Sequence, residues 1–240
     1  QIGHGEIYAE KAAGGGTLTA IALSKLTNKR VNFITALGRD YYGYKCHKEL
    51  TKLGLNVHVA WRSTATRRGV SMLNKSGERS ITVIGQRLSP IASDNLPWEL
   101  ASSSDGIFVS ATDKPGLIKC RRCKTLVSTP RIGLELMKSS NVKFNAIIGS
   151  DNDAYERKIL NSHLNADIVV KTRGESGGEF TRGRKYKVYE KINKPIDSYG
   201  CGDNFAAGVT AGLSANWEID EAIKLGSQLG AECAKSLGPY

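Results

Sequence analysis

One stretch of the chain decides its fold: Asp197-Ser198-Tyr199-Gly200-Cys201-Gly202-Asp203-Asn204-Phe205-Ala206-Ala207-Gly208. From residue 203 onwards alanines are frequent, and Phe205 and Val209 lie one turn apart, which predicts a helix. The preceding glycines, Gly200 and Gly202, allow a sharp turn that exposes backbone N–H groups. Unpaired N–H groups and the positive end of the helix dipole attract anions at such a helix start. The stretch therefore predicts a tight turn that binds an anion.

Asp203 lies at the start of this predicted helix, where a carboxylate would repel a bound phosphate. Two interpretations stay open. Asp203 caps the helix after a tight turn, as aspartate often does. Alternatively, it is a general base beside an anion hole, placed there to take a proton from an attacking hydroxyl.

The whole chain has the length and composition of one globular domain. Its 240 residues are enough to bury a full core, and 40% hydrophobic with 24% charged residues is typical of soluble proteins. No run approaches the roughly 18 apolar residues that span a bilayer, and the first residues do not have the pattern of a signal peptide. We therefore expect a single domain over residues 1–240, a cytoplasmic location and no membrane partner. Because the chain starts without Met and ends abruptly at Gly238-Pro239-Tyr240, we also expect residues to be missing at one or both ends.

The formal net charge of +11 favours anionic partners such as nucleotides. The cations are scattered, and the densest group, residues 182–187, has the pattern of a hairpin turn. Neither interleaved aromatic residues nor a known module accompanies it, so we do not expect a nucleic-acid interface.

Five cysteines, an odd number without a secretory signal, indicate a reducing compartment. Cys120 and Cys123 form a lone CxxC, and the four histidines are isolated from one another. A zinc site needs two further ligands at suitable spacing, so we expect two cysteines on one helical turn.

Short apolar runs alternate with helical segments along the chain. Strands are expected at 31–36, 56–61, 106–110, 125–128, 145–150 and 167–172, and helices at 42–53, 151–163, 203–214 and 219–236. Two hairpins are expected, at 69–84 and 177–189. This alternation predicts an α/β fold with a mostly parallel central sheet, helices on both faces and a small β-strand lid, with lid strands near 7–12 and 66–84. Ligands bind at the carboxyl ends of the strands in such sheets.

Three further segments place glycines beside expected strands or helices. Gly14, Gly15 and Gly16 lead into an alanine-rich helix, residues 36–43 form a turn after a strand, and residues 171–178 place glycines at a strand end.

In this order and spacing, the four segments resemble the ribokinase family of sugar kinases, the PfkB-type carbohydrate kinases. Residues 197–208 match the family pattern D-[ST]-x-G-A-G-D-x-F-x-A-G, with Cys201 in place of the usual Ala. The resemblance extends from about Gly14 to Gly238 and implies a ribokinase-like fold. It also implies that the N-terminal strand of the family and its C-terminal end are missing from the chain. It also implies a kinase that uses ATP and Mg²⁺.

The resemblance makes Asp203 the base that deprotonates the accepting hydroxyl. The N–H groups of Gly200, Cys201 and Gly202 would stabilise charge on the transferring phosphoryl group. At a helix N-terminus, the pKa of the Cys201 thiol is expected to be lowered.

Thr172, Gly174 and Gly177 match the family segment that lies against the nucleotide, although an ordinary strand end followed by a hairpin has the same pattern. Asp153 and Glu156 fall where the family has N-x-x-E, which organises Mg²⁺ through water. Two acids one turn apart can equally be solvated residues at a helix start.

The substrate side of the resemblance involves three glycines, and one cation site accompanies it. Gly14, Gly15 and Gly16 match the glycines near the sugar, but Leu18 stands where the family has a sugar-contacting Asn. Asp197 matches a residue that contributes to a monovalent-cation (K⁺) site in several relatives, and it can also simply initiate a turn.

The sequence therefore predicts an ATP-dependent phosphotransferase acting on a hydroxyl of a sugar or sugar-like molecule. A nucleoside or other alcohol kinase of the same fold is the alternative, as is an inactive nucleotide- or sugar-binding protein. Because lid strands often form a dimer contact in this family, we also expect a homodimer through the lid.

Overall fold

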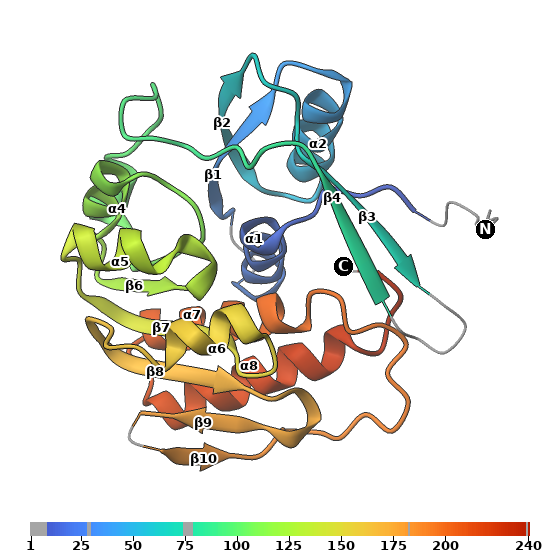
Figure 1. Ribbon diagram of the computed structural model, residues 1–240, viewed down its shortest axis with the longest axis vertical. Coiled ribbons are helices and arrows are strands. Elements are labelled where there is room, and N and C mark those ends of the chain that lie inside the picture. The colour runs from blue at the N-terminus through green and yellow to red at the C-terminus, as the bar shows by residue number, and fades with distance from the viewer. Residues whose placement is uncertain (1–8, 28–29, 74–78, 182, 239) are drawn as a thin grey trace.

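The computed structural model describes residues 9–27, 30–73, 79–181, 183–238 and 240, and its centre is a six-stranded sheet (Figure 1). The strand order is β10-β9-β8-β7-β6-β5. Strands β5 to β8 are parallel, and β9 and β10 complete one edge as an antiparallel hairpin. The bounds are β5 (Gly106–Val109), β6 (Thr125–Ser128), β7 (Phe144–Ser150), β8 (Ala166–Thr172), β9 (Gly178–Phe180) and β10 (Arg184–Tyr186).

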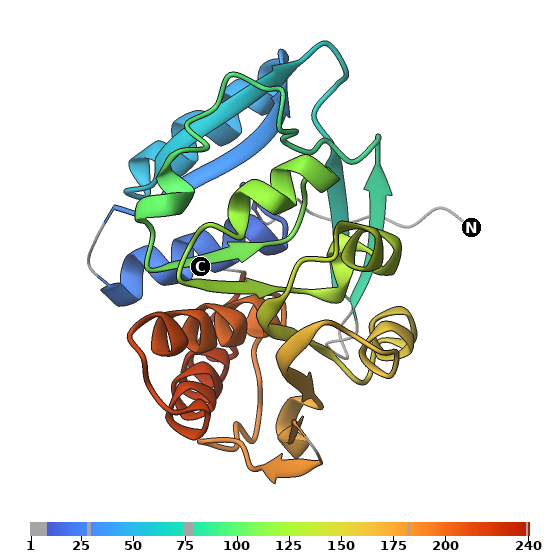
Figure 2. The ribbon, with the colours of Figure 1, turned by 90° about the vertical axis from the view of Figure 1, so that its left-hand side faces the viewer.

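Helices cover both faces of this sheet (Figures 1 and 2). One face packs against α7 (Cys201–Ser214) and α8 (Ile219–Cys233), and the other against α4 (Lys114–Cys120), α5 (Leu134–Ser140) and α6 (Ala154–Leu160). Adjacent strand residues point to opposite faces, so Leu126 and Ile147 belong to the α4–α6 core while Val127 and Ile148 belong to the α7–α8 core. Burial on both faces explains why these strands are continuous apolar runs.

A second, smaller sheet pairs β1 (Asn32–Gly38) with β2 (Asn56–Arg62) in parallel, connected by α2 (Tyr41–Lys52). Its core includes Ile21 of α1 (Gly15–Thr27) together with Leu50 and Leu55. Within the described ranges, no strand joins this pair to the six-stranded sheet. The two sheets are therefore separate, and the central sheet does not continue through β1.

The hairpin of β3 (Arg68–Leu73) and β4 (Arg79–Ile84) stands apart from both sheets (Figure 1). Its strands pair antiparallel, with Val70 opposite Thr82. The second expected lid strand, near residues 7–12, lies partly outside the described residues, and residues 9–12 form no strand.

The predicted fold class is confirmed, and the predicted strands begin and end within two residues of the observed ones. The helix expected over 151–163 is shorter, because Asp153 caps α6 and the chain leaves the helix at Asn161. Several short elements were given no bounds from the sequence, among them α3 (Leu100–Ser103), α4, α5 and the 3₁₀ turn η1 (Pro130–Ile132). None of the described helices has the length and apolar character to cross a bilayer.

A glycine contact fixes how closely α7 and α8 pack. A Cβ atom on Gly208 would lie 2.6 Å from the Cα atom of Gly226, which is closer than side chains approach backbone. The two helices therefore meet backbone to backbone, and Phe205 and Val209 are buried beside the crossing.

We expect Gly208→Ala to destabilise the fold, because its methyl group must push α8 away. Overpacking of this kind costs about 1–3 kcal/mol, which lowers Tm by several degrees in a chain of this size. Thermal unfolding followed by circular dichroism measures the change. Gly202→Ala is the matched control in the same helix, since no atom lies within 4 Å of its added Cβ. Equal Tm values for the two variants would contradict the packing argument.

Candidate active site

The turn before α7 presents backbone donors. Gly200 caps the helix in a left-handed conformation (φ +88°), which glycine adopts without strain. The described residues offer no hydrogen-bond acceptor to the N–H groups of Gly200 and Gly202. The N–H of Cys201 donates to the carbonyl of Ser198 at 3.3 Å. Two of the three predicted donors are thus available to a ligand, and the third is engaged within the turn.

Asp203 lies directly against the start of α1. A Cβ atom on Gly15 would be 2.9 Å from Asp203 Oδ1, and the hydroxyl of Thr19 donates to the Asp203 carbonyl at 3.3 Å. A Cβ atom on Gly16 would be 2.7 Å from Ser110 Oγ. The structure therefore brings together the two glycine segments of the sequence. The positive ends of two helices meet at one carboxylate.

This location changes the acidity of Asp203. Burial raises the pKa of its carboxyl from the usual 3.8 to about 6, the nearby carboxylate of Glu156 raises it further, and Arg131 partly offsets both. A carboxyl group with this pKa is ionised at neutral pH and still accepts a proton readily, as a general base must.

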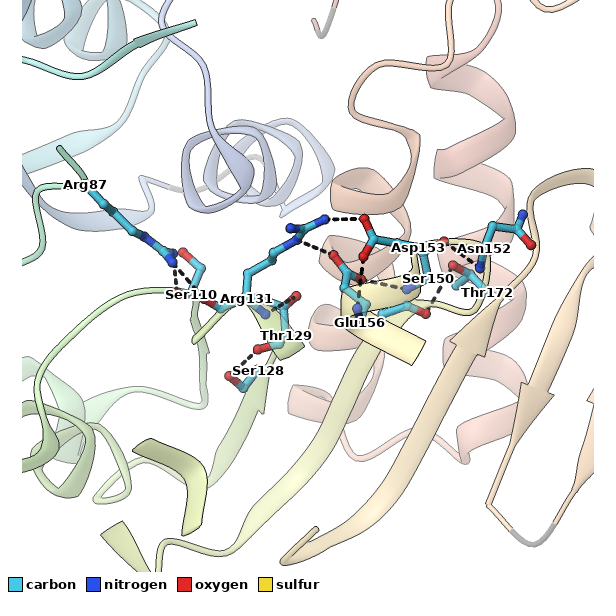
Figure 3. Close-up of polar contacts among 11 residues, drawn as sticks. Arg87, Ser110, Ser128, Thr129, Arg131, Ser150, Asn152, Asp153, Glu156 and Thr172 are labelled. Carbon is cyan, nitrogen blue, oxygen red and sulfur yellow. Dashed lines mark hydrogen bonds and ion pairs between the residues drawn. The ribbon is translucent and has the colours of Figure 1, made fainter. Parts of the chain in front are cut away.

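Arg131 joins the two acids that the sequence singled out at α6 (Figure 3). Its Nε donates to Glu156 and an Nη donates to Asp153, both at 2.6 Å. Asp153 also accepts from the N–H of Glu156 at 2.9 Å, and this bond, together with Arg131, lowers the pKa of Asp153. Glu156 accepts from the N–H of Ser150 at 2.7 Å. The pair thus begins a helix and also forms an ion-paired cluster.

The cluster of Arg131, Asp153 and Glu156 has too few ligands to bind a metal ion directly. In the described ranges, no group of three or more His, Cys, Asp or Glu side chains could hold a metal ion. The paired carboxylates of Asp153 and Glu156 fit the orientation of metal-bound water better than a coordination shell of their own.

Arg87 links the base of the β3–β4 hairpin to this edge of the sheet. Arg87 donates to the carbonyl oxygens of Ser110 and Arg131, both at 2.7 Å (Figure 3). Burial lowers the pKa of its guanidinium, and the neighbouring cations Arg67 and Arg131 add to this. Arg87 and Arg131 thereby bring two positive charges to this edge of the sheet.

Sequence reasoning missed Arg87, Arg131 and Ser110. Ser110 and Arg131 follow β5 and β6 almost directly, and polar residues just beyond the carboxyl ends of parallel strands were a usable signal. Arg87 carries no such signal, because its contacts are distant in sequence.

The predicted nucleotide segment lies at the carboxyl end of β8. Thr172 ends the strand, and its hydroxyl donates to the carbonyl of Gly149 at 3.3 Å. Gly174 (φ +58°) and Gly177 (φ +77°) turn the chain into β9. A Cβ on Gly177 would collide with the Tyr186 carbonyl, so this position requires glycine for the hairpin itself. Figure 3 shows Thr172 beside Ser150 and Asp153 at the same edge.

Asp197 is buried in the loop before α7 and connects it to the end of the chain. Its carboxylate accepts from the N–H of Tyr199 at 2.8 Å and from that of Gly238 at 3.1 Å. These bonds match the turn-initiating role. Leu18 of α1 is only 2% exposed, so its side chain is packed inside the protein and is not presented to a ligand.

The predicted lowering of the Cys201 pKa is wrong. A hydrogen bond with the Cys233 thiol and burial both raise the pKa of Cys201, and the same bond lowers the pKa of Cys233. A local contact with a second thiol outweighs the helix dipole on which the prediction depended.

Comparison with known proteins agrees with this geometry. The model of the pfkB family of carbohydrate kinases matches residues 134–240. Adenosine kinase from Schizosaccharomyces pombe is 37% identical over 75 residues, which span 30% of this chain and only 22% of that protein. Ribokinase from Thermotoga maritima superposes with a TM-score of 0.73 at 18% identity, covering 95% of this chain and 82% of the ribokinase. Arabidopsis thaliana ribokinase, solved with ribose and ATP, gives 0.71 at 16% identity over 95% and 83% of the two chains.

The structural matches establish the ribokinase-like fold, and the family match covers the part of the chain that holds α7 and its turn. The resemblance to the PfkB carbohydrate kinases predicted from the sequence is confirmed by the family match over residues 134–240 and by the ribokinase-like fold.

The raised pKa of Asp203 should make the fold less stable at neutral pH. Between about pH 4 and 6 the folded state retains a proton that the unfolded state has lost, so stability falls as pH rises through this range. We expect Asp203→Asn to be more stable than the wild type by about 1–3 kcal/mol above pH 7. The difference should vanish near pH 4. Urea unfolding at pH 4 and pH 8 measures both values, and a variant that is less stable at pH 8 would contradict the burial argument.

Proposed function

We propose that the chain is an ATP-dependent phosphotransferase whose acceptor is a hydroxyl of a sugar or sugar-like molecule. The observation that carries this proposal is the placement of Asp203 between the starts of α1 and α7, with a pKa near 6. A negative carboxylate at two helix ends that attract anions would weaken the binding of phosphate alone. A role as the base that removes a proton from the acceptor explains why a carboxylate lies there.

In the proposed reaction, Asp203 takes the proton of the acceptor hydroxyl as its oxygen attacks the γ-phosphorus. The available N–H groups of Gly200 and Gly202 then donate to the oxygens of the transferring group, while Cys201 holds the turn. The dipole of α7 adds positive potential at the same place. Alignment and charge stabilisation are the main requirements of phosphoryl transfer.

The proposed nucleotide side lies along the carboxyl ends of β7 and β8. Thr172, Gly174 and Gly177 would contact ATP, with backbone accessible at Gly174 because it carries no side chain. Mg²⁺ would neutralise the nucleotide phosphates when bound. Asp153 and Glu156 would orient its waters, and Asp197 would contribute to a K⁺ site.

The acceptor class is the least constrained part of the proposal. Gly15 and Gly16 bring backbone, and no side chain, up to Asp203 and Ser110, and the space beside Gly14 is open. This glycine run suits a compact polyol. The segment shared with an adenosine kinase favours a nucleoside as the second candidate. Buried Leu18 removes one expected sugar contact and supports neither candidate over the other.

The kinase proposal predicts acceptor-dependent release of ADP from Mg-ATP, measured across sugars, polyols and nucleosides. We expect Asp203→Asn to lower kcat by about 10²–10⁴ while the protein remains folded. In the wild type, kcat/KM should fall as pH drops below about 6, because the base is then protonated.

Ser89→Ala, in the loop beyond Arg87, is a control with unchanged turnover expected, since Ser89 contributes only its carbonyl to the Arg62 hydrogen bond. Turnover of Asp203→Asn within a few-fold of the wild type would reject Asp203 as the base. ATP binding without any turnover would favour the inactive binding protein.

We also propose that the β3–β4 hairpin is a lid and a contact between two copies of the chain. Val70, Met72, Ile81 and Val83 are each about half exposed on it, and they lie on both faces of the hairpin. One face can then cover a ligand while the other pairs with a second lid. Light scattering should show a dimer that Ile81→Lys converts to monomers, with Ile118→Lys, another exposed apolar site, as control. A wild-type monomer at high concentration would contradict the dimer.

A further inference from the structure

Two cysteines from opposite ends of the α7–α8 pair lie together beneath the anion-binding turn. Cys201 is the first residue of α7, and Cys233 is the last residue of α8. Each thiol shifts the pKa of the other, raising that of Cys201 and lowering that of Cys233. Cys233 Sγ is also 3.4 Å from the carbonyl oxygen of Tyr199, which precedes the turn by one residue.

Backbone contacts show the same approach independently. A Cβ atom on Gly230 would lie 3.2 Å from the carbonyl oxygen of Cys201. Gly230 precedes Cys233 by three residues, so both project from one side of α8 toward the start of α7. The N–H of Ile196 donates to the carbonyl of Ala234 at 2.9 Å and fixes the loop before α7 to the end of α8.

We propose that Cys201 and Cys233 form a reversible disulfide that shifts the first turn of α7 and switches the site off. The two cysteines are free in this structure, whereas a disulfide holds its sulfur atoms about 2.0 Å apart. Reaching that distance must move Cys201 toward α8. Gly200 and Gly202 flank Cys201 directly, so the anion-binding N–H groups move with it, away from Asp203 and α1.

The chemistry needs an oxidant, which a low-molecular-weight disulfide supplies. The thiolate of one cysteine attacks a sulfur of that disulfide, which forms a mixed disulfide and releases one thiol. The thiolate of the second cysteine then attacks the protein-bound sulfur, so the intramolecular bond forms and a second thiol leaves. Two protein thiols are oxidised and one external disulfide is reduced to two thiols. A dithiol reductant reverses both steps.

The remaining cysteines lack this arrangement. Cys120 and Cys123 are buried in the core on the opposite face of the sheet, and burial raises the pKa of Cys120 to about 12. Cys46 belongs to α2, next to the smaller sheet. Thiol exchange requires an accessible thiolate, so a half-buried pair is more reactive than a buried one.

The test treats the full chain with glutathione disulfide and maps the cysteines by peptide mass spectrometry. We expect a Cys201–Cys233 disulfide that dithiothreitol reverses. Kinase turnover should fall about 10²-fold in the oxidised protein, because a displacement of about 1 Å at such a site has that effect. Cys233→Ser should keep its turnover in glutathione disulfide, and Cys46→Ala should lose it as the wild type does.

Hydrogen exchange of the backbone amides of residues 197–205 is a readout that needs no activity. The loss of turnover depends on the proposed kinase function, whereas the bond and the exchange change do not. We expect the exchange rates of these amides to differ between the oxidised and reduced protein, and to be equal in Cys233→Ser under both conditions. Unreacted Cys201 and Cys233, a different pairing, or a formed bond with unchanged exchange would each overturn the proposal. If the reduced protein shows no kinase turnover, only the proposed function fails.

Discussion

The contact on which the site depends is the backbone-to-backbone crossing of α7 and α8 at Gly208 and Gly226. It fixes α7 against the sheet, and α7 in turn decides where the turn at Gly200–Gly202 lies. At its other side, α7 meets the first residues of α1, where Gly15 leaves room for Asp203. Two close approaches, each of which requires glycine, therefore set the position of one carboxylate.

That carboxylate is held at an energetic cost. Burial disfavours its charge, and Glu156 adds repulsion, while two helix ends and Arg131 act in the opposite direction. The balance leaves Asp203 ionised at neutral pH, yet close to the point at which it would bind a proton. A fold selected only for stability would carry a neutral residue here, so the cost itself indicates that the site has a function.

Much of this organisation could be predicted because it is local in sequence. Strand and helix positions follow from apolar periodicity, and the turn before α7 follows from Gly200, Gly202 and the alanines after them. The match to a family pattern then supplied the roles of residues that periodicity alone does not distinguish. The separation of β1 and β2 from the main sheet was missed, because strand periodicity does not define which strands become neighbours.

Other features are invisible to local patterns. The bonds of Arg87 and the ion pairs of Arg131 span more than twenty residues, and no spacing rule connects them. Cys233 lies 32 positions after Cys201, and this partner reversed the pKa shift expected from the helix dipole alone. Electrostatic predictions fail first where two titratable groups meet through the fold.

Arg87 gives the β3–β4 hairpin a mechanical connection to the sheet. The guanidinium of Arg87 donates to the carbonyls of both Ser110 and Arg131. One side chain therefore connects the base of the hairpin to the ends of β5 and β6. The hydroxyl of Ser110 lies beside Gly16, and Arg131 forms ion pairs with Asp153 and Glu156 at the start of α6. If the hairpin moves while the hydrogen bonds of Arg87 stay intact, Ser110 and Arg131 keep their positions. If the movement breaks these bonds, Ser110 and Arg131 both lose the same support.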